Sequence, residues 1–230
     1  MNDLKQQARR AGILYVAIAL IAPIGLMVVP GELIVSGNAA ATADNIRAAE
    51  GLFRLGMASD LVHQVIGIFL VLALYRLFQP VNEGLARLLV VLGALVSVPI
   101  MFVNVLNDLA ALTIVRGPDY LAAFNQAQLD ALAYLFVRLH GLGIMVASVF
   151  WGLWLFPFGL LVVRSRFIPK ALGYLLMVAG TAYLAAALTA IALPQLSPIV
   201  SKIALPLELA ELPIIFWLAI WGARPVPAEG

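Results

Sequence analysis

Ionisable and amide side chains recur at one-turn spacing inside stretches that are otherwise apolar. Asp60, His63 and Gln64 are spaced i, i+3 and i+4, and Asn104 and Asp108 are spaced i and i+4. Because residues three or four apart share one helical face, each set is expected to line one face of a helix. Carboxylate oxygens and imidazole nitrogens bind protons or cations, and they are also ligands for zinc or iron.

Two further stretches carry comparable groups. Arg138 and His140 are two residues apart and are therefore expected on different faces of a helix, whereas Glu208 and Glu211 lie one turn apart. Ionisable residues inside a membrane are costly and almost always face the bundle interior. We predict one polar cavity formed by Asp60, His63, Asn104, Asp108, Arg138, His140, Glu208 and Glu211.

Composition indicates which elements hold these residues. The 230 residues are 63% hydrophobic and 11% charged, whereas soluble domains carry about a quarter charged residues. The long unbroken apolar runs lack the alternating pattern of a membrane barrel. We therefore predict an all-α integral membrane bundle, surrounded by the lipid bilayer, with residues 1–230 forming a single domain. Its six transmembrane helices are expected at about 11–29, 55–78, 85–115, 131–163, 172–193 and 204–221.

Basic residues set the expected orientation, because Lys and Arg are retained on the cytoplasmic side. Nine lie on one side of the predicted spans: Lys5, Arg9, Arg10, Arg76, Arg87, Arg164, Arg166, Lys170 and Arg224. Four lie on the other: Arg47, Arg54, Arg116 and Lys202. Both termini are therefore predicted to be cytoplasmic. The ionisable residues lie six to ten positions from the nearest outer charge, or roughly 9–15 Å deep, so the cavity should open outward from the outer half of the membrane.

The charge balance of this cavity requires that carboxylates keep protons, that histidines become cationic, or that a cation binds. If Asp60, Asp108, Glu208 and Glu211 all ionise against Arg138, four negative charges face one positive charge. Uncompensated buried charge is not tolerated. We expect a proton or a cation on at least one of Asp60, Asp108 and Glu211, and an ion pair of Arg138 with Asp108 or a glutamate.

Three functions fit this pattern. The first is proton- or cation-coupled binding or transport of a small molecule. The second is a metal-dependent hydrolase acting on lipid, with His63, His140, Asp60 and Glu211 as candidate ligands, although no HExxH motif is present. The third is a haem protein with His63 and His140 as axial ligands. A structural or accessory subunit is a further alternative. No catalytic residue and no cofactor is assigned.

Other features narrow the range of partners and local structures. The net charge of +2, with basic residues at span ends, gives no reason to expect nucleic-acid binding, and the absence of cysteine excludes disulfides and thiolate sites. Thr42 is expected to cap a short helix after the first span. Pro206 and Pro213 are expected to kink the sixth span.

Three segments together resemble a known family. They are ARRAGILY at 8–15, PFGLLVVRSRFIPKALG at 157–173 and ELPIIFWLAIWG at 211–222. With them the chain resembles a bacterial family of membrane proteins catalogued only as domain of unknown function 4386. The resemblance implies a multi-pass protein of the bacterial cytoplasmic (inner) membrane with no assigned reaction.

Overall fold

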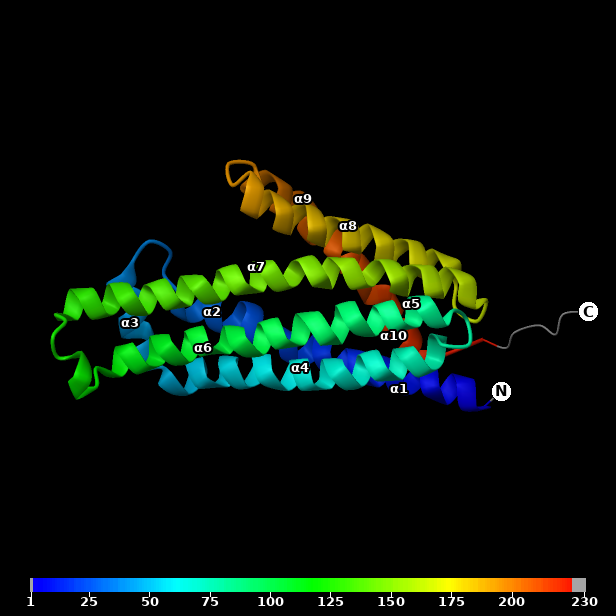
Figure 1. The fold of residues 1–230 in the computed structure, drawn as a ribbon, viewed down its shortest axis with the longest axis horizontal. Coiled ribbons are helices and arrows are strands. Elements are labelled where there is room, and N and C mark those ends of the chain that lie inside the picture. Colours follow the sequence, from blue (N-terminus) through cyan, green and yellow to red (C-terminus); the bar gives the residue numbers. More distant parts are fainter. Residues whose placement is uncertain (1, 225–230) are drawn as a thin grey trace, which may run out of the picture. The chain divides into compact units, whose positions relative to one another are not determined.

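The computed structural model describes residues 2–224, and within this range every regular element is a helix. Six helical segments are long and apolar enough to cross a membrane, which confirms the predicted all-α fold with six spans (Figure 1). They are Asp3–Leu33, Glu50–Phe78, Glu83–Arg116, Gln126–Ser165, Lys170–Ala192 and Ser197–Ile220. Most of them extend several residues beyond the limits predicted from hydropathy, because the polar ends of these helices also keep their helical hydrogen bonds.

Three of the six spans contain a change of helix type. The first consists of α1 (Asn2–Pro23), the π-helical segment η1 (Ile24–Val28) and α2 (Val29–Leu33). The third consists of α5 (Glu83–Val90), π-helical η2 (Val91–Val96) and α6 (Ser97–Arg116). The sixth consists of α9 (Ser197–Glu208), 3₁₀-helical η4 (Leu209–Glu211) and α10 (Leu212–Ile220). Its 3₁₀-helical segment lies between Pro206 and Pro213, the two prolines from which the sequence predicts a kink.

The remaining spans are single helices, α4 (Glu50–Phe78), α7 (Gln126–Ser165) and α8 (Lys170–Ala192). Two short elements lie between spans: α3 (Ala39–Ala48) and η3 (Asp119–Leu121). The cap of α3 is Asn38, whose side chain accepts from the N–H of Ala41. The prediction of Thr42 as the cap is wrong, because its hydroxyl donates back to the carbonyl of Asn38 inside the turn.

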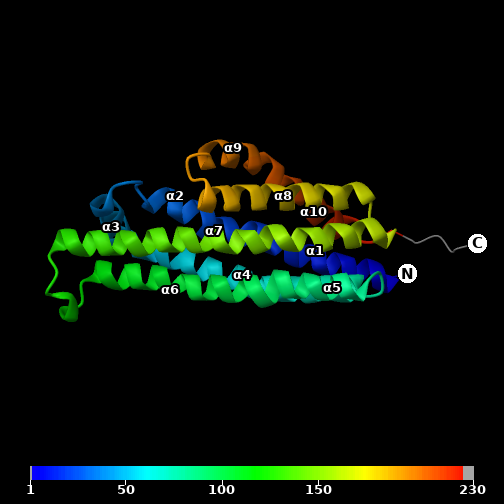
Figure 2. The ribbon, with the colours of Figure 1, turned by 45° about the horizontal axis from the view of Figure 1, so that its top comes forward.

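The chain divides into two compact units by its contacts. Unit 1 comprises Met1–Ile18, Val65–Pro99 and Met145–Gly230, and unit 2 comprises Ala19–Gln64 and Ile100–Ile144. In unit 1, α8 and α9 run side by side (Figure 2). Its aromatic side chains form a chain of contacts, with Phe78 against Phe158 and Phe167, and Tyr15 against Trp154.

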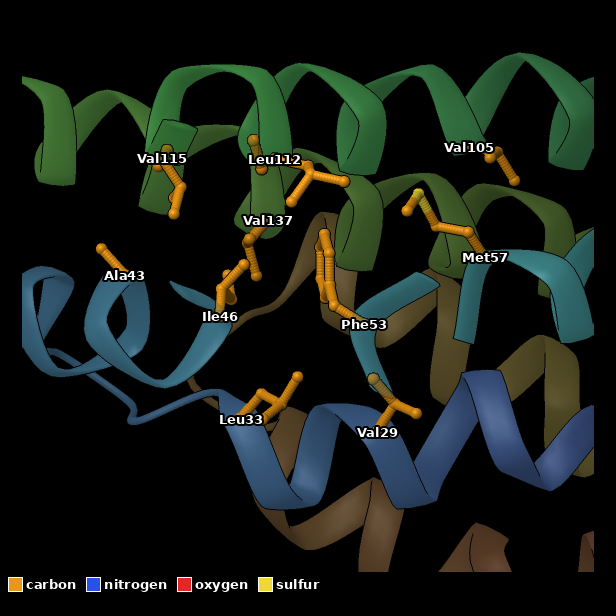
Figure 3. Close-up of a cluster of buried hydrophobic side chains, with 12 residues drawn as sticks. Val29, Leu33, Ala43, Ile46, Phe53, Met57, Val105, Leu112, Val115 and Val137 are labelled. Atoms are coloured by element: carbon orange, nitrogen blue, oxygen red, sulfur yellow. The ribbon is translucent and has the colours of Figure 1, made fainter. Parts of the chain in front are cut away.

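Unit 2 has an apolar core where α3 meets the ends of α2, α4, α6 and α7 (Figure 3). Ala43 and Ile46 of α3 are buried there with Phe53, Leu112 and Val137. Between membrane-spanning helices such side chains stabilise the fold mainly by close packing, because lipid is as apolar as the core. The core therefore fixes α3 across this end of unit 2.

Candidate metal centre

Three buried ligand-bearing side chains meet in unit 2, each supplied by a different helix. They are Asp60 from α4, Asp108 from α6 and His140 from α7, with exposed fractions of 2%, 7% and 6%. One ligand atom from each lies within 4.8 Å of the other two. The imidazole lies between the carboxylates, with Nε2 3.5 Å from Asp60 Oδ2 and Nδ1 3.0 Å from Asp108 Oδ2.

Two of the polar atoms in this group have unused hydrogen-bonding capacity. Asp60 Oδ1 and His140 Nδ1 are buried and have no hydrogen-bond partner among the residues that the structure describes. The short approach of His140 Nδ1 to Asp108 is thus a contact whose alignment does not make a hydrogen bond. Buried polar groups are nearly always satisfied, so these atoms are available to a cation or a proton.

The backbone of the first span is shaped to admit Asp60. Pro23 precedes the π-helical segment η1, and Gly25 within it lies directly against the Asp60 carboxylate, where a Cβ would come within 2.8 Å of its Cγ. Ser59 links the two helices, accepting from the N–H of Gly25 and donating to the carbonyl of Ile21. Insertions of π-helix are frequently found at functional sites.

Asn104 holds the other side of the group. Its amide donates to the main-chain carbonyl of His140 at 2.9 Å, and its oxygen accepts from Asn107 at 3.0 Å. Gly143 leaves the room for this side chain, since a Cβ there would overlap the Asn104 amide. Sequence reasoning had not identified Gly25, Ser59 or Gly143. Glycine inside an apolar span, and a serine next to Asp60, were the only signals available.

His63 faces the group but its nitrogens are engaged elsewhere. Nδ1 bonds to the carbonyl of Ser59 at 2.9 Å, and Nε2 lies 2.9 Å from the amide of Gln64. With Nδ1 donating, Nε2 accepts, and neither nitrogen has a free lone pair for a metal. Its distance to Asp60, 3.9 Å from Nδ1 to Oδ1, is too long for a hydrogen bond.

Arg138 has a different position from the one expected. It is exposed on α7, two residues before the buried His140. The expected ion pair with Asp108 or a glutamate does not occur among the described residues. The physical reason is the spacing itself, because residues two apart on a helix point about 200° apart.

The two glutamates belong to unit 1, whereas the other six predicted site residues belong to unit 2. Glu208 ends α9 and Glu211 ends η4, and both are partly buried. The hydroxyl of Tyr15 donates to Glu211. Within unit 1, Glu211 therefore has a neutral donor as its partner, and among the described residues no cationic side chain pairs with it.

A cavity of about 160 Å³ adjoins the three ligand residues in unit 2. Asp60, Asp108 and His140 form its polar end. The rest of its wall is mainly apolar and includes Leu26, Val29, Leu33, Phe53, Met57 and Ile144. Such a combination of apolar walls with a few convergent polar groups is typical of small-molecule sites.

Comparison with protein families gives one match that covers most of the chain. The family model described as "Domain of unknown function (DUF4386)" matches residues 10–222. Neither the curated proteins nor the solved structures include a match to this sequence. The chain is thus a multi-pass membrane protein whose activity must be inferred from its own side chains.

Proposed function

Because the chain belongs to the DUF4386 family of proteins of unknown function, we propose from its side chains that it binds a divalent cation inside the membrane and uses this cation to hold a small molecule. Asp60, Asp108 and His140 would be the ligands. The observation that carries the proposal is the meeting of three buried ligand atoms from three helices, with Asp60 Oδ1 and His140 Nδ1 lacking hydrogen-bond partners.

The net charge of the three side chains favours binding of a divalent cation. Two ionised carboxylates beside a neutral imidazole carry a net charge of −2, which a divalent ion would cancel. Removing isolated charge from water is far more costly than burying a compensated group. Arg138 is exposed and has no acidic partner among the described residues, so it does not supply this compensation.

Geometry and ligand type favour zinc or a similar transition metal. Zinc bonds of about 2.1 Å place two tetrahedral ligands about 3.4 Å apart, and the three ligand atoms here lie within 4.8 Å of one another. Mixed nitrogen and oxygen donors suit zinc, iron or manganese. Three protein ligands leave a coordination position open, and the adjoining cavity gives a bound molecule access to it.

The open position also supports a second candidate, a metal-dependent hydrolase acting on lipid. Asp60, Asp108 and His140 would hold the metal, which would supply an activated water for the hydrolysis of an ester to an acid and an alcohol. The apolar cavity beside the ligands would accept the hydrocarbon part of such a substrate. We do not propose the bis-histidine haem, since both nitrogens of His63 have other partners.

Metal analysis of protein purified in detergent tests the proposal. After equilibration with zinc and removal of excess, we expect about one zinc per chain, and loss of it in Asp60→Asn, Asp108→Asn and His140→Gln. His63→Gln is the matched control, because it removes a buried histidine of the same unit that is not a proposed ligand. Equal zinc content in the wild type and His140→Gln would refute the assignment. Protein without bound metal would leave proton exchange as the role of these groups.

For location, we propose the bacterial cytoplasmic membrane with both termini in the cytoplasm, as the asymmetry of basic residues predicts. The polar end of the cavity would then lie in the outer half of the membrane.

A further inference from the structure

Most of the residues that line the cavity in unit 2 are buried. The lining residues that are more than nine-tenths buried include Leu33, Phe53, Met57, Asp60, Asp108 and His140. Gly141 alone among the lining residues is exposed. Leu26, Pro30 and Ile144, which also line the cavity, are partly buried.

Apolar layers close the route from the α3 end of unit 2. On α4, Met57 and Phe53 lie three and seven residues from Asp60 towards that end. On α6, Leu112 and Val115 lie four and seven residues from Asp108. Such spacings put each pair on the same helical face as the ligand residue, and all four side chains are buried in one cluster with Ile46 of α3 (Figure 3).

An opening remains beside α7. A Cβ built on Gly141 would meet nothing within 4 Å, although this residue lines the cavity. Gly141 lies 15 residues from the start of α7 at Gln126, or about 22 Å along the helix. With the proposed orientation this position lies inside the span Gln126–Ser165, so the opening would face lipid. The exposed Arg138, one turn nearer the outer surface, would reach the head groups with its long side chain.

We propose that the cavity receives a neutral lipid through a side opening between α7 and the first span, at Gly141. This inference rests on the proposed cation site and names the class of molecule that reaches it. Apolar walls accommodate hydrocarbon, and a cavity of about 160 Å³ is close to the roughly 150 Å³ of engineered apolar cavities that bind benzene. The site thus holds the part of a chain nearest to the head group.

Charge selects the head group. A divalent ion with two carboxylates and a neutral imidazole is already neutral, so an added carboxylate or phosphate would leave a buried negative charge. An alcohol or an ester carbonyl supplies an oxygen ligand without added charge. The expected ligand is therefore a long-chain alcohol or ester, with its oxygen at the open coordination position and its chain along Leu26 and Ile144.

Photolabelling tests the opening. A long-chain alcohol with a diazirine near its hydroxyl would be incorporated into membranes containing the full chain, and labelled peptides would be identified by mass spectrometry. We expect zinc-loaded wild type to be labelled in the segments around Leu26 and Ile144. Gly141→Trp should reduce this labelling at least tenfold, because the indole would fill the opening, and zinc analysis of the same sample reports separately on the cation site. Gly67→Trp is the matched control: Gly67 is another glycine within a span with open space at its Cβ, and it lies outside the cavity.

Each outcome separates this inference from the cation site. Unchanged labelling of Gly141→Trp would overturn the side opening even if zinc binds. Labelling that is lost in Gly141→Trp but unaffected by removal of zinc would support the opening and refute the cation as the anchor of the head group. Stronger labelling by the matching fatty acid than by the alcohol would overturn the charge selection.

Discussion

The side-chain amide of Asn104 donates to the main-chain carbonyl of His140, with 2.9 Å between Nδ2 and the oxygen. This bond joins α6 to α7 at the residue whose imidazole lies between Asp60 and Asp108. A side chain that fixes the backbone of a ligand residue controls the position of its ring. Partners of this kind typically change metal affinity about 10–100-fold when they are removed.

Replacement of Asn104 by Leu should therefore weaken zinc binding about 10–100-fold. The substitution removes the bond to His140 and also leaves the amide of Asn107 without its acceptor. Competition with a chelator of known affinity would measure the change. Thr113→Val serves as the control, because it removes a hydrogen bond that stays within α6, from Thr113 to the carbonyl of Leu109. Equal affinities of Asn104→Leu and the wild type would show that Asn104 does not position His140.

Replacing two glycines of α7 by alanine should change the stability of the protein in opposite directions. Gly143→Ala should destabilise the protein by about 1–3 kcal/mol, because the new methyl group would displace the Asn104 side chain. Gly141→Ala should have no such cost and should stabilise the helix by up to about 1 kcal/mol, since its Cβ enters open space. Thermal unfolding in detergent compares them. Similar melting temperatures for both variants would contradict the close approach of Gly143 to Asn104.

Much of the architecture could be predicted from hydropathy, because a bilayer requires long apolar helices. The one-turn spacing of Asn104 and Asp108 also placed them on one buried face. Which faces of neighbouring helices contact each other could not be predicted in the same way. Lipid and the bundle interior are both apolar, so the pattern of hydrophobic residues does not reveal how each helix is rotated. Only the structure brings Asp108 next to His140 rather than Arg138.

Hydrogen bonds between residues close in sequence determine two further features that the sequence left open, the role of His63 and the cap of α3. His63 looked equivalent to His140 as a ligand, yet the carbonyl of Ser59 and the amide of Gln64 occupy its nitrogens. Both partners lie within four residues of His63, and a histidine on a helix can reach several main-chain and side-chain groups at such distances. Choosing among these partners requires coordinates, and the same is true of Asn38 over Thr42 as the cap of α3.

The orientation predicts where reporters will be active. A cytoplasmic reporter fused after Gly230 should be active, and a periplasmic reporter at the same site should not, because the excess of basic residues lies on the side of both termini. Insertion of the reporters between α2 and α3, near Gly37, should give the reverse pattern, since one span separates this connection from the N-terminal segment. Periplasmic activity at Gly230 would refute the proposed orientation.

The arginine that forms an ion pair with a buried carboxylate in unit 2 is Arg47, and not Arg138 as the sequence had suggested. Arg47 of α3 binds both Asp44 and Asp130, and Asp130 on α7 is buried, with a further hydrogen bond from Gln126 at 2.9 Å. Arg47→Met should destabilise the protein by about 1–2 kcal/mol, because it leaves Asp130 buried without its cation. Loss of a fully buried pair costs about 3–5 kcal/mol. The smaller value applies here since the Arg47 side chain is 32% exposed.

A double-mutant cycle decides whether this ion pair exists. Adding Asp130→Asn to Arg47→Met should recover part of the lost stability, because the uncompensated charge is then gone, whereas Arg138→Leu alone should cause no loss. Arg138 is the matched control, since it is an arginine of unit 2 that is exposed and has no ion-pair partner among the described residues. Thermal unfolding in detergent of the single and double variants gives the coupling energy. Purely additive losses for Arg47 and Asp130, or a loss in Arg138→Leu as large as that in Arg47→Met, would contradict this assignment of the pair.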